Sequence, residues 1–359
     1  MLIELREDKG TFLMSKIKYS FRNDYSELAH PKVLKKLSSV GEKQFEGYGL
    51  DIFSKKASDL IRDKIGMDKA DVHFVSGGTQ ANLVVLSSIL RPHEAVISCG
   101  TGHIFTNETG AIEATGHKIC ISPGESGKLY PKDIETVIDA HDNEHRVKPK
   151  VVFISHSTEI GTVYTRDELL AIHKCCKNNN LFLYLDGARL GQGINSDACD
   201  LTYQDIAKFT DVLYLGGTKN GGLFGEAIVI TNESLQSDFR YFLKQRGALL
   251  AKGAAIGIQF LALLENNLYD ELAIRANQTA RKLADGIMEM NIGFYSDPES
   301  NQVFPILPLD VSEKMHSLYG FYDWKMIDNE SVANRLVVSW ATPEHIITDF
   351  LEDLRSFIK

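Results

Sequence analysis

The feature that most limits the fold is a regular alternation of short apolar runs with segments of helical periodicity along most of the 359 residues. Apolar runs with strand character cover residues 72–75, 95–98, 117–121, 151–154, 181–185 and 227–230. Segments with helical spacing lie before and between them, at residues 31–39, 83–90, 107–115, 131–140 and 166–177. Strands joined through helices run parallel and need helices on both faces. The alternation therefore predicts an α/β fold with a mostly parallel sheet and helices on both faces.

The pattern changes near residue 265, which predicts a second domain. Residues 235–266 have long helical character, and short apolar runs at 303–307 and 335–339 and a helical segment at 344–358 follow. A chain of this length suits one large domain with a smaller companion. We therefore expect an N-terminal arm over residues 1–30, a large ligand-binding α/β domain over residues 31–265 and a small α+β domain over residues 266–359.

Composition and charge narrow the class of protein. The chain is 43% hydrophobic and 24% charged, as in ordinary globular proteins, and its net charge of −9 disfavours a nucleic-acid partner. No apolar run approaches a membrane span, and the charged first eighteen residues have no signal-peptide core, although Met14 is an alternative start. We therefore expect a cytoplasmic protein that binds neither nucleic acid nor membrane.

The cysteines and histidines do not predict a disulfide framework or a metal site. The five cysteines, which include the adjacent Cys175 and Cys176, form no Cys-x-x-Cys pair. Buried free thiols in a reducing cytosol are therefore expected. His141 and His145 stand four residues apart in a charged segment, which is typical of a solvated loop rather than a metal site.

One lysine stands in an unusual setting within residues 211–226. A short apolar run ends in Gly216 and Gly217, and Lys219 then lies between that pair and two further glycines. Glycines allow a sharp turn and a close approach of the backbone to a ligand, and open α/β sheets bind ligands at the carboxyl ends of their strands. This stretch alone is typical of a solvated loop lysine. The alternative is a partly buried, nucleophilic amine that forms a Schiff base.

Two other stretches give that lysine a cofactor to react with. Asp186 ends the apolar run at 181–185, where its carboxylate either caps the next helix or meets a positive group. Residues 76–82 join a short strand to a helix through a glycine turn, and the free N–H groups of such a helix start attract phosphate. A phosphate cradle, a partner for a ring nitrogen and an amine for an aldehyde are what pyridoxal phosphate requires.

In this order and spacing the stretches resemble the threonine aldolase / β-eliminating lyase family, which comprises fold-type-I enzymes that use pyridoxal phosphate. Within it, the chain closely resembles the bacterial low-specificity L-threonine aldolases. The resemblance runs from about Phe21 to the C-terminus. It is carried by residues 76–83, 103–111, 157–165, 186–189 and 216–221. It implies that the large domain binds pyridoxal 5'-phosphate. A nicotinamide-binding enzyme is disfavoured because no Gly-x-Gly-x-x-Gly follows an early strand.

The resemblance also implies roles for residues around the cofactor. Lys219 matches the Schiff-base lysine, and Asp186 matches the partner of the pyridine nitrogen. Arg189 matches the arginine that reaches the ring hydroxyl. The phosphate cradle matches Gly78 and Thr79. His103, otherwise typical of a partly buried histidine at a helix start, matches the residue that stacks on the ring and assists proton transfer.

Further matches concern the substrate and a neighbouring subunit. Arg335 matches the residue that grips the substrate carboxylate, a task that suits its bidentate fork. The alternative is that it is merely an arginine at a strand edge. Asn23, together with Asp24, matches the N-terminal segment on the substrate side. Tyr48 and Lys252 match residues that reach the site of a neighbouring subunit, which implies a homodimer or homotetramer with its site at the interface.

The chain departs from the family pattern at two positions. Glu159 stands where better-known aldolases carry a histidine that handles the substrate hydroxyl, and a glutamate also accepts that proton. Ala254 stands near Lys252 where the family commonly has an arginine, which implies weaker binding of the cofactor phosphate or weaker activity.

The expected reaction is retro-aldol cleavage of L-threonine, L-allo-threonine and related β-hydroxy-α-amino acids to glycine and an aldehyde, a reaction that serves glycine biosynthesis. Either Glu159 or His103 takes the hydroxyl proton. Because one fold hosts several chemistries, two alternatives stay open. One is another pyridoxal-phosphate-dependent β-eliminating lyase or an aminotransferase acting on a small amino acid. The other is a homologue that binds the cofactor without catalysis.

Overall fold

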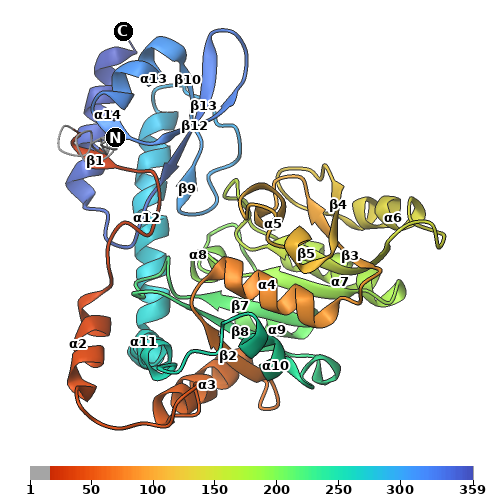
Figure 1. Cartoon of the computed structure of the whole chain (residues 1–359). Coiled ribbons are helices and arrows are strands. Elements are labelled where there is room, and N and C mark those ends of the chain that lie inside the picture. The colour runs from red at the N-terminus through yellow and green to blue at the C-terminus, as the bar shows by residue number, and fades with distance from the viewer. Residues whose placement is uncertain (1–16, 359) are drawn as a thin grey trace, which may run out of the picture. The chain divides into compact units, whose positions relative to one another are not determined.

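A computed structural model describes residues 17–358, so Met14 lies outside the described part of the chain (Figure 1). The chain divides into two compact units. The larger unit is Leu28–Ile274, and the smaller one combines Arg275–Lys359 with the N-terminal arm through Glu27. The boundary falls within helix α12 (Leu268–Met288). The three-way division at residues 30 and 265 stays a prediction, although by contact the arm groups with the C-terminal unit.

The larger unit is built on a seven-stranded sheet in the order β2-β8-β7-β6-β5-β3-β4. The strands are β2 (Asp71–Val75), β3 (Glu94–Cys99), β4 (Lys118–Ser122), β5 (Lys148–Ser155), β6 (Phe182–Asp186), β7 (Val212–Gly216) and β8 (Glu226–Ile230). Neighbours from β4 to β7 pair in parallel, whereas β8 is antiparallel to both β7 and β2. The mostly parallel sheet is thus confirmed, with one reversed strand.

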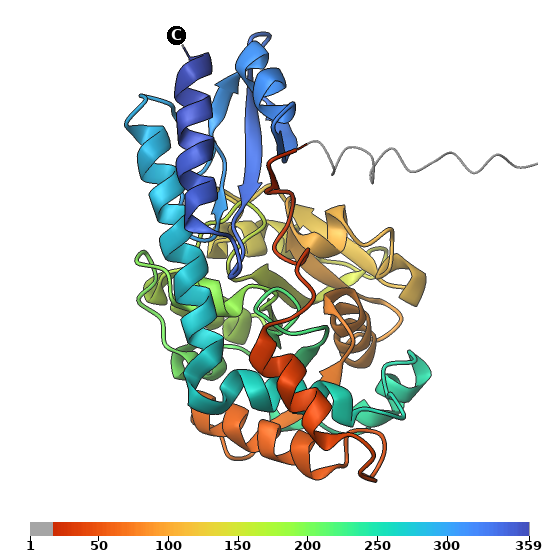
Figure 2. The ribbon, with the colours of Figure 1, turned by 90° about the vertical axis from the view of Figure 1, so that its left-hand side faces the viewer.

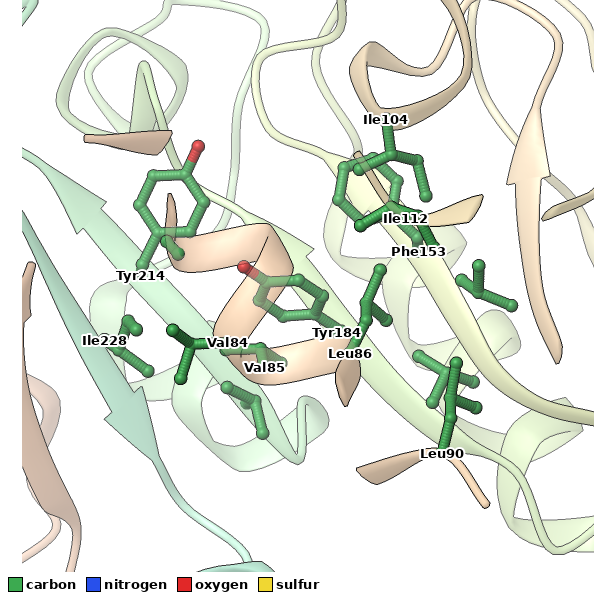
Figure 3. Close-up of a cluster of buried hydrophobic side chains, with 14 of the residues drawn as sticks. Val84, Val85, Leu86, Leu90, Ile104, Ile112, Phe153, Tyr184, Tyr214 and Ile228 are labelled. Atoms are coloured by element: carbon green, nitrogen blue, oxygen red, sulfur yellow. The ribbon is translucent and has the colours of Figure 1, made fainter. Parts of the chain in front are cut away.

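Helices cover both faces of this sheet. On one face, Val84 and Val85 of α4 (Gly78–Ile89) pack with Tyr214 of β7 in a buried apolar cluster (Figure 3). Val212 of β7 belongs to the same cluster. The alternate β7 residue Leu213 points to the other face and is equally buried. A second layer is therefore present, in which each helix packs against the next. Its members are α6 (Pro131–Asp139), α7 (Arg166–Asn178), α9 (Tyr203–Phe209), α3 (Ile52–Ile65) and α11 (Ala254–Leu264).

Local sequence signals explain where several helices begin. Pro31 opens α2 (Pro31–Val40), where its missing N–H costs no hydrogen bond. Thr165 caps α7 by accepting a hydrogen bond from the backbone N–H of Glu168, whose side chain accepts one from the N–H of Thr165. This capping box satisfies two backbone donors at the helix start. Pro31 and Thr165 thus mark where α2 and α7 begin.

The smaller unit has its own antiparallel sheet and core. Strand β13 (Ser331–Val337) pairs with β10 (Ile306–Pro308), β12 (Tyr322–Met326) and β9 (Gln302–Val303). Helices α13 (Leu309–His316) and α14 (Glu344–Phe357) complete it (Figure 2). A Cβ at Gly286 of α12 would stand 2.3 Å from Cδ1 of Leu351 in α14, so these two helices pack closely. The buried cluster includes Phe21 from the arm. This α+β architecture agrees with the expected class of a small C-terminal domain.

Two expected helices are wrong in extent. The predicted helix at 107–115 is instead the short α5 (His103–Thr106) and a 3-10 turn at Glu113–Thr115, because Thr109 and Gly110 have positive φ angles of 53° and 70°. The long helical stretch at 235–266 is interrupted at Gly247, with a φ of 69°, between α10 (Phe239–Gln245) and α11. Residues in the left-handed region end an α-helix.

The cysteines are free thiols, as expected. Four of them are buried, but Cys199 is only half-buried, so the expectation of buried thiols is wrong for that residue. In the part of the chain that the structure describes, every helix is too short or too polar to cross a membrane.

Candidate active site

One edge of the large sheet collects most of the predicted cofactor residues. Asp186 is the last residue of β6, and its Cα is paired with that of Ser155, the last residue of β5. Lys219 follows the end of β7, and His103 follows the end of β3. Because these strands are parallel, their carboxyl ends meet at one edge, where open α/β sheets bind ligands. The sequence separation of these residues is therefore bridged by the topology.

Asp186 is held in a fixed orientation by three donors. Its Oδ1 accepts hydrogen bonds from the Tyr214 hydroxyl at 2.5 Å and from the backbone N–H of Ala188 at 2.9 Å. Its Oδ2 is 3.4 Å from Nδ2 of Asn82. Burial, followed by the charge of Asp186, raises the pKa of Tyr214 well above its ordinary value, so the hydroxyl remains a donor. The site therefore keeps a buried carboxylate pointing one way.

Lys219 lies in a tight turn between β7 and β8. A Cβ at Gly217 would stand 2.7 Å from the carbonyl oxygen of Gly225, and Gly221 has a φ of 87°. Only glycine fits both positions without displacing the backbone. The Gly217 N–H donates to Oε2 of Glu226 at 2.8 Å. Glycine thus allows the half-buried lysine to sit beside a buried carboxyl group.

Glu226 is a titratable group that the sequence analysis missed. Burial raises its pKa to about 7, and hydrogen bonds from Thr218 and from the Gly217 N–H oppose that rise. The positive charge of Lys219 also lowers the pKa of Glu226, whereas the carboxylate of Asp186 raises it. Lys219, Asp186 and Glu226 therefore share one electrostatic environment. A carboxylate directly before the buried run at 227–230 was the signal in the sequence.

A second group of polar residues surrounds His103. The Nδ1 atom of His103 lies 2.8 Å from Oε1 of Glu108, and that oxygen also accepts a hydrogen bond of 2.7 Å from Nδ2 of Asn82. The backbone N–H of His103 donates to Oε1 of Glu159 at 3.0 Å, and Ser155 Oγ donates to the same oxygen at 2.6 Å. The predicted pair of His103 and Glu159 is thus brought together.

Glu159 is a carboxyl group whose pKa is shifted by its surroundings. Burial raises its pKa above the ordinary value, and the nearby Asp186 carboxylate adds to that rise. The hydrogen bond from Ser155 and the positive charge that His103 can carry act in the opposite direction. A carboxylate with a raised pKa is a stronger base than an exposed one.

The start of α4 lies after β2, at the same edge of the sheet. The helix begins at Gly78, and among the described residues no side chain caps it. Thr79 is exposed in the first turn. A Cβ at Gly78 would stand 3.1 Å from the hydroxyl oxygen of Tyr214, the residue that holds Asp186. Backbone N–H groups at an uncapped helix start can bind an anion, and this helix start lies beside Tyr214. Arg189 follows three residues after Asp186 and is buried at the start of α8 (Leu190–Ile194).

Two further predicted residues lie on exposed loops. Tyr48 and Lys252 are exposed residues of the larger unit, on two loops joined by a hydrogen bond of 3.2 Å from the Tyr48 N–H to the Ala251 carbonyl. Lys252 and Ala254 border an open hollow of about 420 Å³. A residue that serves a neighbouring molecule is expected to be exposed in this way.

Asn23, Asp24 and Arg335 belong to the smaller unit. Oδ1 of Asn23 accepts hydrogen bonds from the Tyr25 N–H and the Ser26 hydroxyl, and Asn301 donates to Oδ2 of the buried Asp24 at 2.9 Å. Nη2 of Arg335 donates to Oε1 of Gln302 at 2.7 Å. Their proposed substrate contacts remain predictions.

Pattern reasoning missed the residues that orient the predicted ones. Glu108 was part of a family-like stretch but received no role, and Asn82, Tyr214 and Ser155 received none either. The only signals were polar residues within or next to otherwise apolar elements. Among residues 17–358, no group of three or more His, Cys, Asp or Glu is placed to hold a metal ion.

Comparison with known proteins gives a consistent result. The model of the family described as "Beta-eliminating lyase" matches residues 39–308. The chain is 32% identical to a low specificity L-threonine aldolase from Pseudomonas aeruginosa, over 93% of this chain and 96% of that protein. It is similar to the structure of Leishmania major threonine aldolase, with a TM-score of 0.93, 45% identity, and coverage of 95% of this chain and 100% of that one.

A more distant structure identifies the fold alone. A Thermus thermophilus aspartate aminotransferase mutant superimposes with a TM-score of 0.71 at 13% identity, covering 97% of this chain and 94% of that one. The fold is therefore the fold type I of pyridoxal-phosphate enzymes, as the resemblance implied.

Proposed function

The chain belongs to the β-eliminating lyase family, and on that premise we propose that it is a pyridoxal-phosphate-dependent threonine aldolase. It would cleave L-threonine, L-allo-threonine and related β-hydroxy-α-amino acids to glycine and an aldehyde. The observation that carries this proposal is the placement of Lys219, Asp186 and the uncapped start of α4 at one edge of the sheet.

These residues fit pyridoxal phosphate. The Lys219 amine would hold the cofactor aldehyde covalently, and the buried Asp186, oriented by Tyr214, would accept a hydrogen bond from the ring nitrogen. The first-turn N–H groups at Gly78 and Thr79 would receive the phosphate. When bound, the cofactor supplies an electron sink for the pair released as the Cα–Cβ bond breaks.

The remaining residues would bind the substrate and move its proton. Arg335 would grip the substrate carboxylate through a bidentate contact, with Asn23 on the substrate side. Arg189 would reach the cofactor's ring hydroxyl, and His103 would lie against its ring. The substrate β-hydroxyl would give its proton to Glu159 or to His103, which are joined by the hydrogen bond between the His103 N–H and Glu159 Oε1.

The assembly would be a homodimer or homotetramer in which Tyr48 and Lys252 reach the site of a neighbouring subunit. Their exposure in the larger unit supports this arrangement. The five free cysteines fit a reducing compartment, and we therefore infer a cytoplasmic location. Glycine as the product would place the enzyme in glycine biosynthesis.

The test is a product assay with purified protein and added pyridoxal phosphate. Each of L-threonine and L-allo-threonine is expected to give acetaldehyde and glycine in equal molar amounts. No aldehyde from these two or from a β-hydroxy-phenylalanine-type substrate would refute the aldolase assignment. Pyruvate and ammonia from L-serine would instead identify a β-eliminating lyase, and turnover only with a keto-acid acceptor would identify an aminotransferase. Cofactor uptake without any turnover, which the replacement at Ala254 makes worth testing, would identify a non-catalytic homologue.

A further inference from the structure

Glu108 is a buried acid that has hydrogen-bond partners at only one of its two carboxylate oxygens among the described residues. Its side chain has an exposed fraction of 0%. A carboxylate at that depth is expensive unless donors surround it. Oε1 has two partners, Nδ1 of His103 at 2.8 Å and Nδ2 of Asn82 at 2.7 Å. Oε2 is buried and has no hydrogen-bond partner among the described residues. The carboxylate therefore serves His103 and Asn82.

The contact with Glu108 decides which ring nitrogen of His103 carries the proton. A carboxylate accepts hydrogen bonds only, so Nδ1 must be the protonated nitrogen of the neutral imidazole. The lone pair is then on Nε2, at the opposite side of a ring whose side chain is 37% exposed. A carboxylate that fixes a histidine tautomer in this way controls which ring nitrogen accepts a proton.

Asn82 extends the same arrangement to Asp186. The Tyr184 hydroxyl donates to Oδ1 of Asn82 at 2.8 Å, which orients the amide. The amide nitrogen then faces Oε1 of Glu108 at 2.7 Å and Oδ2 of Asp186 at 3.4 Å. Figure 3 shows Tyr184 and Tyr214 rising from the buried cluster beside α4, with the hydroxyl oxygens at the ends of their rings. The apolar core thereby supports the orientation of both acids.

We propose that Glu108 is a positioning residue that fixes His103 with Nε2 as its proton-accepting nitrogen, and that Asn82 aligns Glu108 with Asp186. This inference rests on the proposed function, because it assigns His103 a proton-transfer task. It does not rest on cofactor occupancy, since every contact that carries it is made by the chain itself.

The first measurement uses the cofactor-free wild-type protein labelled with ¹⁵N-histidine. The chain has 11 histidines, and the His103 signals are assigned by their loss in His103→Asn. At a pH where His103 is neutral, the expected long-range spectrum has a protonated Nδ1 and an unprotonated Nε2. A protonated Nε2 in the neutral ring would overturn the proposal, whatever reaction the enzyme catalyses.

The second measurement compares Glu108→Gln with Glu94→Gln. Glu94 is a matched control because it is a buried acid at the opposite end of β3, where it accepts from the Arg91 N–H. Glu108→Gln is expected to lower kcat by about 10–100-fold, with KM changed by less than about 3-fold, and to mix the His103 tautomers. Glu94→Gln is expected to leave kcat and the His103 tautomers unchanged. Glu108→Asp, which keeps the charge, is expected to have a higher kcat than Glu108→Gln.

The outcomes separate this inference from the proposed function. Equal loss of kcat and thermal stability in Glu108→Gln and Glu94→Gln, with unchanged His103 tautomers, would make Glu108 merely structural. If Glu108→Gln does not fold, the wild-type spectrum and Glu108→Asp still decide. An absence of aldolase activity with a protonated Nδ1 would refute the proposed function and leave the positioning role in place.

Discussion

Two neighbouring strands of the large sheet, β3 and β5, lead into histidines with opposite surroundings. His103 follows β3 and is partly exposed, with Nδ1 on the Glu108 carboxylate. His156 follows β5 directly and is completely buried. Its Nδ1 accepts from the Tyr164 N–H at 3.3 Å, and its Nε2 lies 3.7 Å from Sγ of Cys199.

The difference shows what makes a histidine at a strand end chemically available. Burial lowers the pKa of His156 to about 4, and the nearby charge of Lys128 adds to that effect. A Cβ at Gly193 would stand 2.5 Å from Cδ2 of His156, so the ring also fills its space tightly. His156 is therefore a neutral packing residue. His103 differs by having an acidic partner on one side and access on the other.

Replacing the two histidines should give the largest effects, and the effects should differ in kind. His103→Asn is expected to lower kcat/KM by about 10²–10⁴-fold with little change in melting temperature, because it removes a proton-transfer group. His156→Gln is expected to lower the melting temperature instead and to keep the kcat/KM of the folded fraction. Steady-state kinetics and thermal unfolding of the same preparations check both. Similar losses of kcat/KM in the two variants would contradict the distinction.

The low pKa of His156 should appear in the pH dependence of stability. Between its ordinary value of 6.5 and about 4, the unfolded chain binds a proton at this residue that the folded chain does not. The free energy of unfolding should therefore fall as pH falls through this window, by on the order of 3 kcal/mol from this group. Urea unfolding at several pH values measures it. A slope that His156→Gln leaves unchanged would exclude His156 as its source.

Glu226 is a useful contrast to His156, because burial raises the pKa of the carboxyl group and lowers that of the imidazole. Between its ordinary value of 4.5 and about 7, the folded carboxyl group is protonated while the unfolded one is ionised. Stability from this group is thus present below that window and falls as pH rises through it, by on the order of 3 kcal/mol. Glu226→Gln should flatten that part of the profile. If the free energy of unfolding of Glu226→Gln and of the wild type falls in parallel from pH 4.5 to 7, Glu226 is not the source of the decline.

The sequence predicted the positions of residues that end or follow a strand with a clear apolar pattern. Asp186 and Lys219 could be placed because each ends or follows an apolar run whose parallel neighbours share an edge. The helix expected at 107–115 was wrong because the left-handed residues Thr109 and Gly110 override its helical spacing. Apolar periodicity reports which face is buried, but it does not report a local backbone reversal.

The supporting network was beyond such reasoning. Asn82 and Asp186 are 104 residues apart, and Asn82 and Glu108 are 26 apart, so only the folded sheet brings them together. Nothing in the local pattern separates Asn82 from a polar residue on an exposed helix face. The same holds for the contrast between His103 and His156, because it depends on which acids and which glycine each ring meets in space.

The central claim, that the edge of this sheet forms a pyridoxal-phosphate site with Lys219 as its covalent anchor, is tested most directly by the visible spectrum. Wild-type protein incubated with pyridoxal phosphate and then desalted should retain a yellow absorption band that borohydride treatment fixes to Lys219. Lys219→Ala, treated identically, should lose that covalent attachment. A wild-type protein that stays colourless after incubation, or a borohydride-fixed cofactor in Lys219→Ala, would contradict the account.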